Sequence, residues 1–268
     1  MPATRRAVRQ VNVASLRAIF EHRSDGQIYA QSVETLQQYP PRVTDSLKAW
    51  ARESPQRTFL AQRGPDGAWQ TINYAEAWMR VRWLAGGLLK EGLSPDSPLM
   101  ILSGNSIEHA LLALAAMYVG IPYAPIAPSY SLAVREYGAL GHVFQNFSPS
   151  MVFVQNGAAF EPALKAVLND TRVRVVYQAS EPEKFNSLPL ADLETAGSCL
   201  AADDANRATG PDTVIKILYT SGSTGLPKGV ITTNRMLTSN QQMLRQVMPC
   251  LYENPPVLCD WLPWNHTF

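Results

Sequence analysis

The sequence has only three cysteines, Cys199, Cys250 and Cys259, and it contains no CxxC pair. Three scattered cysteines cannot build a disulfide framework, and a structural zinc site normally needs paired ligands. The sequence also lacks a secretory signal, because its basic start MPATRRAVRQ is not followed by an apolar segment of sufficient length. We therefore expect a protein of the reducing cytoplasm, without a zinc site.

Charged side chains are scarce as well. They make up 17% of the residues, whereas a typical soluble domain has about 25%, and 23 basic against 22 acidic residues leave a net charge of +1. Binding to a nucleic acid backbone needs a clustered positive excess, so the composition argues against a nucleic acid partner. The 46% hydrophobic content excludes disorder and suggests that protein outside these residues covers part of the surface.

No apolar segment is long enough to span a membrane without interruption. Residues 110–134 contain no charged side chain, but Gly120, Pro122, Pro125 and Pro128 break the segment. A membrane span requires about 20 predominantly apolar residues in a helix. We therefore expect a buried helix followed by a buried strand here, and no membrane partner.

Most of the chain alternates between helical and strand patterns. Such alternation predicts βαβ units, and hence an α/β fold with a mostly parallel sheet flanked by helices. A capping box at Asn73 and Glu76 begins one helix, and Gly92 ends it. Residues 180–212 are weakly patterned and are expected to form a surface loop. The other expected helices are 43–51, 107–119, 131–147, 159–168 and 233–248, and the strands are 98–103, 121–126, 151–154, 173–177, 214–220 and 257–263.

The first 42 residues do not follow this alternation of helices and strands, and we interpret them as an extension of the main domain. Asp25-Gly26 lies between two alternating segments, which is a strong signal for a β-hairpin. A second hairpin is expected around residues 64–67. We therefore divide the chain into an N-terminal extension with a hairpin, residues 1–42, and a main domain, residues 43–268.

The chemistry concentrates in YTSGSTGLPKGV, residues 219–230, which follow an apolar strand. Glycines let backbone N–H groups converge on one anion, hydroxyls donate to phosphate oxygens, and Lys228 adds a flexible positive charge. The loop is not a Walker A loop, because Pro227 and Gly229 flank the lysine. The alternative, a serine- and glycine-rich surface turn, explains neither the lysine nor the order of the hydroxyls.

These twelve residues resemble the signature loop of the adenylate-forming superfamily, which includes acyl-CoA synthetases, luciferases and the adenylation domains of peptide synthetases. The segments NYAEAWMRVRWLAGGLL, LALAAMYVGIPYAPIAPSY and ITTNRML also resemble this family, although Asn234 stands where a histidine is common. The resemblance covers residues 43–268. It implies that the loop holds the β- and γ-phosphates of ATP, that Thr220 and Lys228 are catalytic, and that Thr220 also binds Mg²⁺. The implied nucleotide-binding residues are Thr220, Ser221, Gly222, Ser223, Thr224, Gly225 and Lys228.

The end of the chain, WLPWNHTF, resembles the next family segment, where an aromatic residue or histidine lies beside the acyl group. The resemblance assigns substrate binding to His266, Trp264 and Phe268, whose rings suit a planar acid. DWLPWNHTF and the N-terminal hairpin resemble feruloyl-CoA synthetases, which implies a hydroxycinnamic acid such as ferulate. A structural histidine at a strand end remains the alternative for His266, and another acyl-CoA synthetase, acting on fatty or aryl acids, the alternative for the substrate.

Later family segments are missing, namely Tyr-Gly-x-Thr-Glu, Thr-Gly-Asp and the lysine of the small C-terminal domain. The resemblance therefore implies the N-terminal part of an acid–CoA ligase that uses ATP, Mg²⁺ and CoA, with the missing C-terminal half as its partner. We expect little or no pyrophosphate exchange from these 268 residues alone. A truncated, non-catalytic nucleotide-binding or interaction module is the alternative. His22, His109 and His142 lack catalytic or metal-binding spacing and are interpreted as structural.

Overall fold

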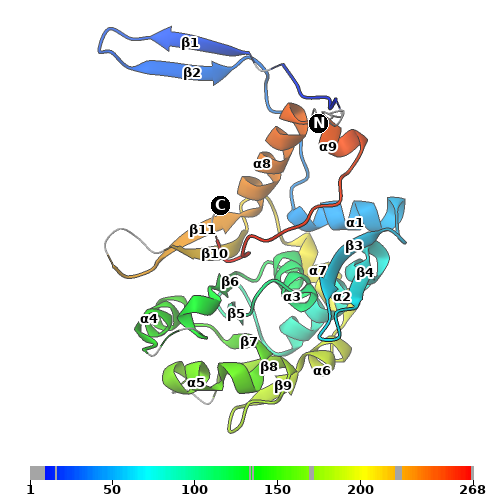
Figure 1. Ribbon diagram of the computed structural model, residues 1–268, viewed down its shortest axis with the longest axis vertical. Coiled ribbons are helices and arrows are strands. Elements are labelled where there is room, and N and C mark those ends of the chain that lie inside the picture. Colours follow the sequence, from blue (N-terminus) through cyan, green and yellow to red (C-terminus); the bar gives the residue numbers. More distant parts are fainter. Residues whose placement is uncertain are drawn as a thin grey trace, which may run out of the picture. The chain divides into compact units, whose positions relative to one another are not determined.

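The computed structural model describes residues 10–15, 17–132, 134, 136–168, 172–220 and 225–266. The chain divides into two compact units (Figure 1). One unit comprises Met1–Tyr39 with Met236–Asp260, and the other Pro40–Arg235 with Trp261–Phe268. The predicted boundary between residues 42 and 43 stays a prediction.

The larger unit is built on a sheet in which the described residues form seven strands, in the order β11-β10-β6-β5-β7-β8-β9. All neighbouring strands run parallel except β10 and β11, which are antiparallel. The α/β fold with a mostly parallel sheet is thereby confirmed. The strands are β5 Leu99–Leu102, β6 Tyr123–Ile126, β7 Met151–Asn156, β8 Arg174–Ala179, β9 Ser187–Pro189, β10 Val214–Thr220 and β11 Lys228–Thr233.

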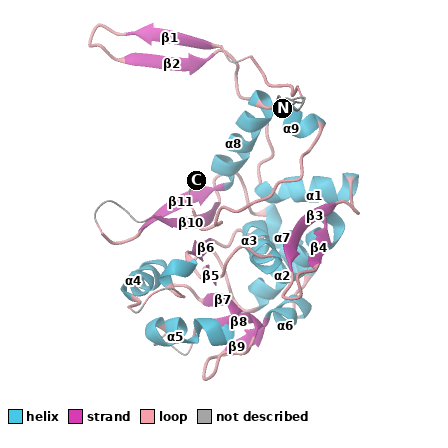
Figure 2. Ribbon diagram, viewed as in Figure 1, coloured by secondary structure: helices cyan, strands magenta, loops and turns pink. Residues whose placement is uncertain are grey.

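Helices flank this sheet (Figures 1 and 2). The apolar faces of α4 (Gly138–Phe147) and α5 (Gly157–Val167) pack on alternate residues of β5 and β7, including Met100 and Val152. A second group of helices packs around α2, which is fully buried along the face that includes Val81, Leu84 and Leu88. This group consists of α1 Val43–Glu53, α2 Tyr74–Lys90, α3 Ile107–Tyr118, α6 Leu190–Thr195 and α7 Cys199–Arg207. The hairpin β3 (Thr58–Arg63) and β4 (Trp69–Asn73) precedes α2, as predicted.

The smaller unit contains the predicted N-terminal hairpin, formed by β1 (Ala18–His22) and β2 (Ile28–Ser32) in antiparallel pairing. Gly26 adopts a φ of +85° in its turn, a conformation that glycine reaches without strain. The unit also holds the larger part of α8 (Asn234–Val247) and the short helix α9 (Cys250–Glu253). The side chain of Gln246 accepts from the Gln37 amide at 2.9 Å and donates to the Thr35 carbonyl at 3.0 Å, which ties the N-terminal segment to α8.

Three expectations for secondary structure were wrong. Residues 131–147 begin with a turn that closes on the Pro128 carbonyl, so helix α4 starts only at Gly138. Residues 180–212 contain the strand β9 and the helices α6 and α7. The two helices bury few apolar residues, such as Leu193 and Ala202, and these are not enough to show a helical period in the sequence. Residues 257–263 form no strand, and the Leu262 carbonyl bonds to the side chain of Asn105 rather than to a neighbouring strand.

The predicted capping box is present at the start of α2. The Asn73 side chain accepts from the Glu76 amide at 2.8 Å, and the Glu76 carboxylate accepts from the Asn73 amide at 3.0 Å. We expect Asn73→Ala to lower the free energy of unfolding by about 1 kcal/mol. The Glu76 amide loses its side-chain acceptor, and the reciprocal bond from the amide of residue 73 to the Glu76 carboxylate becomes less ordered. Urea denaturation measures this change. Asn73→Asp, which keeps the acceptor, should retain most of the stability, and equal losses in both variants would contradict the capping role.

Candidate functional site

The candidate phosphate-binding loop connects β10 to β11 (Figure 2). Ser221, Gly222, Ser223 and Thr224 lie outside the described residues. Thr220 ends β10 and Lys228 begins β11, and these two residues face each other across the antiparallel pair. Directly opposed residues of an antiparallel pair project to the same face, with Cβ atoms about 5 Å apart. The hydroxyl of Thr220 and the exposed side chain of Lys228 therefore lie together at the mouth of the loop.

Helix α4 anchors both ends of this loop. The Tyr219 hydroxyl donates to Asn146 Oδ1 at 2.6 Å, and its ring packs edge-on against Phe147 with centroids 6.5 Å apart. Burial raises the pKa of Tyr219, so the phenol remains a donor. On the far side of the loop, His142 Nε2 lies 3.0 Å from the Pro227 carbonyl, which can only accept, so this nitrogen carries the proton. One helix thus holds the residues before and after the loop.

Glycine is required at position 229 for a packing reason. A Cβ atom built there would lie 2.9 Å from Ile217 Cγ2 and 3.4 Å from the Tyr219 ring. The sequence predicts that glycines free the loop backbone, and Gly225 fits that role with a φ of +110°. Gly229 instead lets the buried Tyr219 ring lie directly across β11. An open hollow of about 340 Å³ borders Tyr219, Asn146 and Gly229 on this side of the strands.

The predicted acyl-binding segment is described over residues 261–266, and side chains from three other parts of the chain contact it. Asn105, in the loop after β5, donates to the Leu262 carbonyl at 2.7 Å and accepts from the Trp264 amide at 3.0 Å. Lys216 Nζ, from the middle of β10, donates to the Trp264 carbonyl at 3.2 Å. The His109 ring meets the Trp264 ring edge-on, with centroids 5.3 Å apart. Phe268 lies outside the described residues.

Two titratable groups beneath this segment have lowered pKa values, and burial is the main cause for both. The pKa of His109 falls to about 4, so the imidazole is neutral at physiological pH. Its Nδ1 lies 3.1 Å from the Gly104 carbonyl and 2.9 Å from Ser103 Oγ. The carbonyl can only accept, so Nδ1 carries the proton. Burial also lowers the pKa of Lys216 to about 8, and in the described part of the chain no carboxylate lies within ion-pair distance of its ammonium group.

Strand β10 carries both predicted sites on one face. Successive side chains of a strand alternate between faces, so Lys216 and Thr220 share one face and Tyr219 projects to the other. Four residues of strand span about 13 Å. Lys216 and Thr220 are therefore about 13 Å apart along the strand, and the Trp264 carbonyl bound by Lys216 lies on the same side of β10 as the Thr220–Lys228 pair. His266 follows in a turn in which its amide donates to the Pro263 carbonyl at 2.9 Å, and its ring is exposed.

No site role for Asn105, His109 or Lys216 follows from the sequence motifs alone. A lysine within the apolar strand VIKILYT was a visible signal for Lys216. Asn105 follows the carboxyl end of β5, which is the edge where open α/β sheets bind ligands. The sequence predicts a structural role for His109, and its ring contacts Trp264 of the predicted acyl-binding segment.

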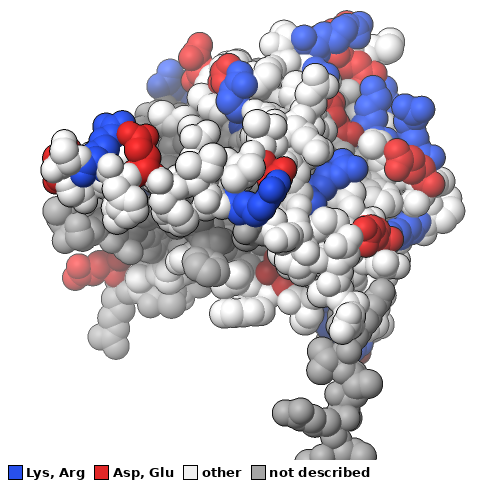
Figure 3. Space-filling view, turned by 90° about the horizontal axis from the view of Figure 1, so that it is seen from above, with Lys and Arg blue, Asp and Glu red and all other residues white. Residues whose placement is uncertain are grey.

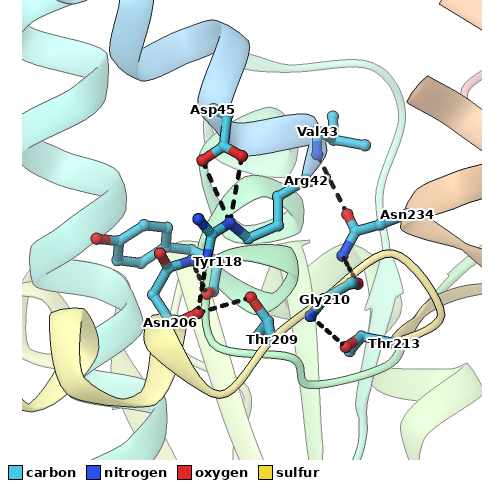
Figure 4. A network of polar contacts seen from close by, with 9 residues as sticks. All are labelled: Arg42, Val43, Asp45, Tyr118, Asn206, Thr209, Gly210, Thr213 and Asn234. Carbon is cyan, nitrogen blue, oxygen red and sulfur yellow. Dashed lines mark hydrogen bonds and ion pairs between the residues drawn. The ribbon is translucent and has the colours of Figure 1, made fainter. Parts of the chain in front are cut away.

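Asn234, the residue that replaces the family's common histidine, is buried in a polar network (Figure 4). Its Oδ1 accepts from the Val43 amide at 3.2 Å, and its Nδ2 donates to the Gly210 carbonyl at 3.0 Å. Arg42 extends the network, since it pairs with Asp45 and donates to the Asn206 carbonyl at 3.0 Å. An amide supplies the donor and the acceptor that this position requires, so Asn234 joins the start of α1 to the turn before β10.

The described residues offer no cluster of three or more His, Cys, Asp or Glu side chains that could hold a metal ion. Mg²⁺ usually binds substrate phosphates with one or two protein oxygens, and so it does not need such a cluster. Thr220 is the residue predicted to supply that oxygen. On the face seen in Figure 3, basic and acidic side chains are interspersed over a largely uncharged surface. None of the described helices is long and apolar enough to cross a membrane.

Comparison with known proteins identifies solved structures with the same fold and a protein family whose model matches this chain. The family model of AMP-binding enzymes matches residues 47–268. A 4-coumarate–CoA ligase of Humulus lupulus is 28% identical over 202 residues, covering 74% of this chain and 35% of that protein. A long-chain-fatty-acid–CoA ligase, FadD15 of Mycobacterium tuberculosis, is 29% identical over 210 residues, covering 77% and 34%. This chain thus spans about a third of the length of these two curated relatives.

Solved structures agree in fold. An acyl-CoA synthetase of Brucella canis matches with a TM-score of 0.60 and 16% identity, over 80% of this chain and 37% of that one. A fatty acyl-adenylate ligase of L. pneumophila, solved with acyl adenylate and pyrophosphate, matches with a TM-score of 0.56 and 19% identity, over 76% and 32%. At these identities the likeness establishes the fold alone.

Proposed function

Because the chain belongs to the AMP-binding enzyme family, we propose that it supplies the phosphate-binding and acid-binding part of an ATP-dependent acid–CoA ligase. In the proposed reaction a carboxylate attacks the α-phosphate of ATP, which gives an acyl-adenylate and pyrophosphate. The thiol of CoA then attacks the acyl carbon, which gives a thioester and AMP. One observation carries this proposal: the Thr220–Lys228 pair and the Trp264 segment lie on one face of β10.

This arrangement supports a division of roles along the strand. Thr220 and Lys228 at the loop mouth bind the β- and γ-phosphates, where the lysine charge offsets the charge of the leaving pyrophosphate. The acid binds along residues 264–266, so its carboxylate points along β10 toward the α-phosphate. Adenylyl transfer depends on such alignment and charge compensation. Bound Mg²⁺ would supply further charge neutralisation at the phosphates, and Thr220 is the described residue that fits as its protein ligand.

We further propose that the acid is aromatic, of the hydroxycinnamic type such as ferulate. Trp264 and His266 offer ring surfaces for a planar substrate, and the 4-coumarate–CoA ligase of Humulus lupulus is among the relatives. A fatty acid is the second candidate, supported by the similarity to the long-chain-fatty-acid–CoA ligase of Mycobacterium tuberculosis.

The test uses the protein expressed from its complete reading frame. It is incubated with ATP, Mg²⁺, CoA and one of four acids: ferulate, 4-coumarate, benzoate or palmitate. Chromatography then measures the CoA thioester. We expect thioester with the two hydroxycinnamates and at least tenfold higher kcat/KM for them than for palmitate. Preference for palmitate would exclude the aromatic assignment, and no thioester with any acid would exclude the ligase proposal.

His266 is proposed to contact the acid, so its replacement should affect the acid and not the nucleotide. We expect His266→Ala to raise the KM for ferulate about tenfold, which corresponds to the loss of one ring contact and one hydrogen bond. The KM for ATP should stay within twofold. His22→Ala, in the distant part of the sequence that forms the N-terminal hairpin, is the matched control. Unchanged kinetics of His266→Ala for every acid would contradict the assignment.

A further inference from the structure

We propose that Lys216 and Asn105 are positioning residues that fix the acid-binding segment to β10, and that the charge of Lys216 makes acid binding weaken at alkaline pH. This inference rests on the proposed function of residues 261–266. It adds a connection between that segment and the strand that leads into the phosphate-binding loop. It also adds a titratable group on which the connection depends.

The Asn105 side chain forms hydrogen bonds with the backbone of the segment, in the way that the backbone of a neighbouring strand would. Its Nδ2 donates to the Leu262 carbonyl at 2.7 Å and its Oδ1 accepts from the Trp264 amide at 3.0 Å. One amide group thus satisfies a carbonyl and an N–H two residues apart. This double contact fixes the rotation of the segment about its own axis, because both bonds must be kept at once. The loop after β5 therefore determines which way residues 262–264 face.

Lys216, on strand β10, forms a further hydrogen bond to the backbone of the same segment. Its ammonium group donates to the Trp264 carbonyl at 3.2 Å, while Asn105 holds the amide of the same residue. The ring of Trp264 lies edge-on against His109 of α3. Trp264 is therefore held at its N–H, its C=O and its ring by three different elements. Lys216 is four residues before Thr220, so the strand that places the phosphate loop also places the acid-binding segment.

The surroundings of Lys216 leave its charge uncompensated. On β6, the Tyr123 ring centroid lies 5.8 Å from Nζ, and burial raises the pKa of that phenol, which stays neutral. On α3, His109 is neutral, and on β11 the residue paired with Lys216 is Thr232. The described residues of these elements thus place no carboxylate beside the ammonium group. A cation that is partly removed from water without a carboxylate beside it is costly, so we infer that the lysine at this position serves the bond to Trp264.

The bond depends on protonation. Burial lowers the pKa of Lys216 to about 8, so the group is charged at pH 7 and mostly neutral at pH 9. Hydrogen bonds from charged donors are roughly twice as strong as those from neutral donors. Loss of the proton therefore loosens Trp264 and the residues that follow it. The KM for the acid should rise between pH 7 and pH 9, while the KM for ATP, bound at the loop mouth, should not follow it.

The experiment measures acid-dependent pyrophosphate exchange, without CoA, in the protein from its complete reading frame between pH 6.5 and 9.5. We expect the wild-type KM for ferulate to rise about fivefold from pH 7 to pH 9, in line with a weakened charged hydrogen bond. Lys216→Arg, which keeps its charge throughout, should hold the KM nearly constant. Lys216→Met and Asn105→Ala should raise it about tenfold already at pH 7, and Lys216→Met should show no step at pH 8. Lys90→Met, an exposed lysine at the end of α2, is the control.

The outcomes separate the two proposals. If the wild type shows no exchange with any acid, the proposed function fails. If it exchanges, but its KM for the acid shows no step near pH 8 that Lys216→Arg removes, the positioning proposal is wrong. A matched rise of the KM for ATP and for the acid in Asn105→Ala and Lys216→Met would also overturn it, because a general loss of structure would produce that result.

Discussion

Replacing Lys228 with methionine is expected to lower the kcat of acid-dependent pyrophosphate exchange about 100- to 1000-fold. The removal of one preorganised cation or donor at developing charge typically has an effect of this size. Lys228 stands opposite Thr220 at the mouth of the loop, exposed, and no described carboxylate pairs with it. Its charge is thus available to the phosphates. Methionine keeps most of the length of the side chain and removes the charge together with its N–H donors.

The control for this prediction is Lys90→Met, which removes one exposed lysine from the end of α2 and keeps the net charge equal to that of Lys228→Met. Exchange should be unaffected in this control. Calorimetry with ATP should show weaker nucleotide binding for Lys228→Met alone. A Lys228→Met protein that folds and exchanges pyrophosphate at more than a third of the wild-type rate would contradict the assigned role.

Gly197→Ala is expected to cost at least 3 kcal/mol of unfolding free energy, the range of severe packing defects. A Cβ atom at this position would lie 1.9 Å from the Trp83 carbonyl oxygen and 2.7 Å from the Gly87 amide nitrogen. Both are backbone atoms of α2, so no side-chain rotation can relieve the overlap. The segment between α6 and α7 must therefore move away from α2, which exposes apolar surface around the buried Leu193.

A second glycine provides the contrast. Gly141 lies within α4, and a Cβ atom built on it would meet no atom within 4 Å. Gly141→Ala should therefore raise the unfolding free energy by about 0.5–1 kcal/mol, because alanine is the better helix former. Urea denaturation of both variants tests the pair. Similar changes for both positions would show that close packing at Gly197 is not what limits substitution there.

Much of the fold follows from local signals in the sequence. The capping box at Asn73, the Asp25-Gly26 turn and the apolar strands β5 and β7 are each specified by a few adjacent residues. The helices α6 and α7 escaped prediction because helices of 6 and 9 residues show hardly more than two turns of periodicity. Their position is fixed by glycine contacts with α2, which no local pattern reveals.

The candidate site divides in the same way. The candidate phosphate-binding loop after β10 is recognisable because its hydroxyls, glycines and lysine lie within twelve consecutive residues. The contacts that hold the predicted acyl-binding segment are not recognisable from the sequence, because Lys216 is 48 residues and Asn105 is 159 residues from the Trp264 atoms that they bind. Only the parallel order β10-β6-β5 brings these residues to one place. The position of Lys216 within an apolar strand indicates that the lysine has a specific role, but it does not indicate that its partner is the Trp264 carbonyl.

We propose that β10 presents the ATP phosphates and a carboxylic acid on one face for adenylyl transfer. Exchange of labelled pyrophosphate into ATP, by the protein from its complete reading frame, tests it most directly. We expect exchange that requires a carboxylic acid, is fastest with a hydroxycinnamate and is lost in Lys228→Met. Exchange that proceeds equally without acid, or that is absent with every acid tested, would contradict it.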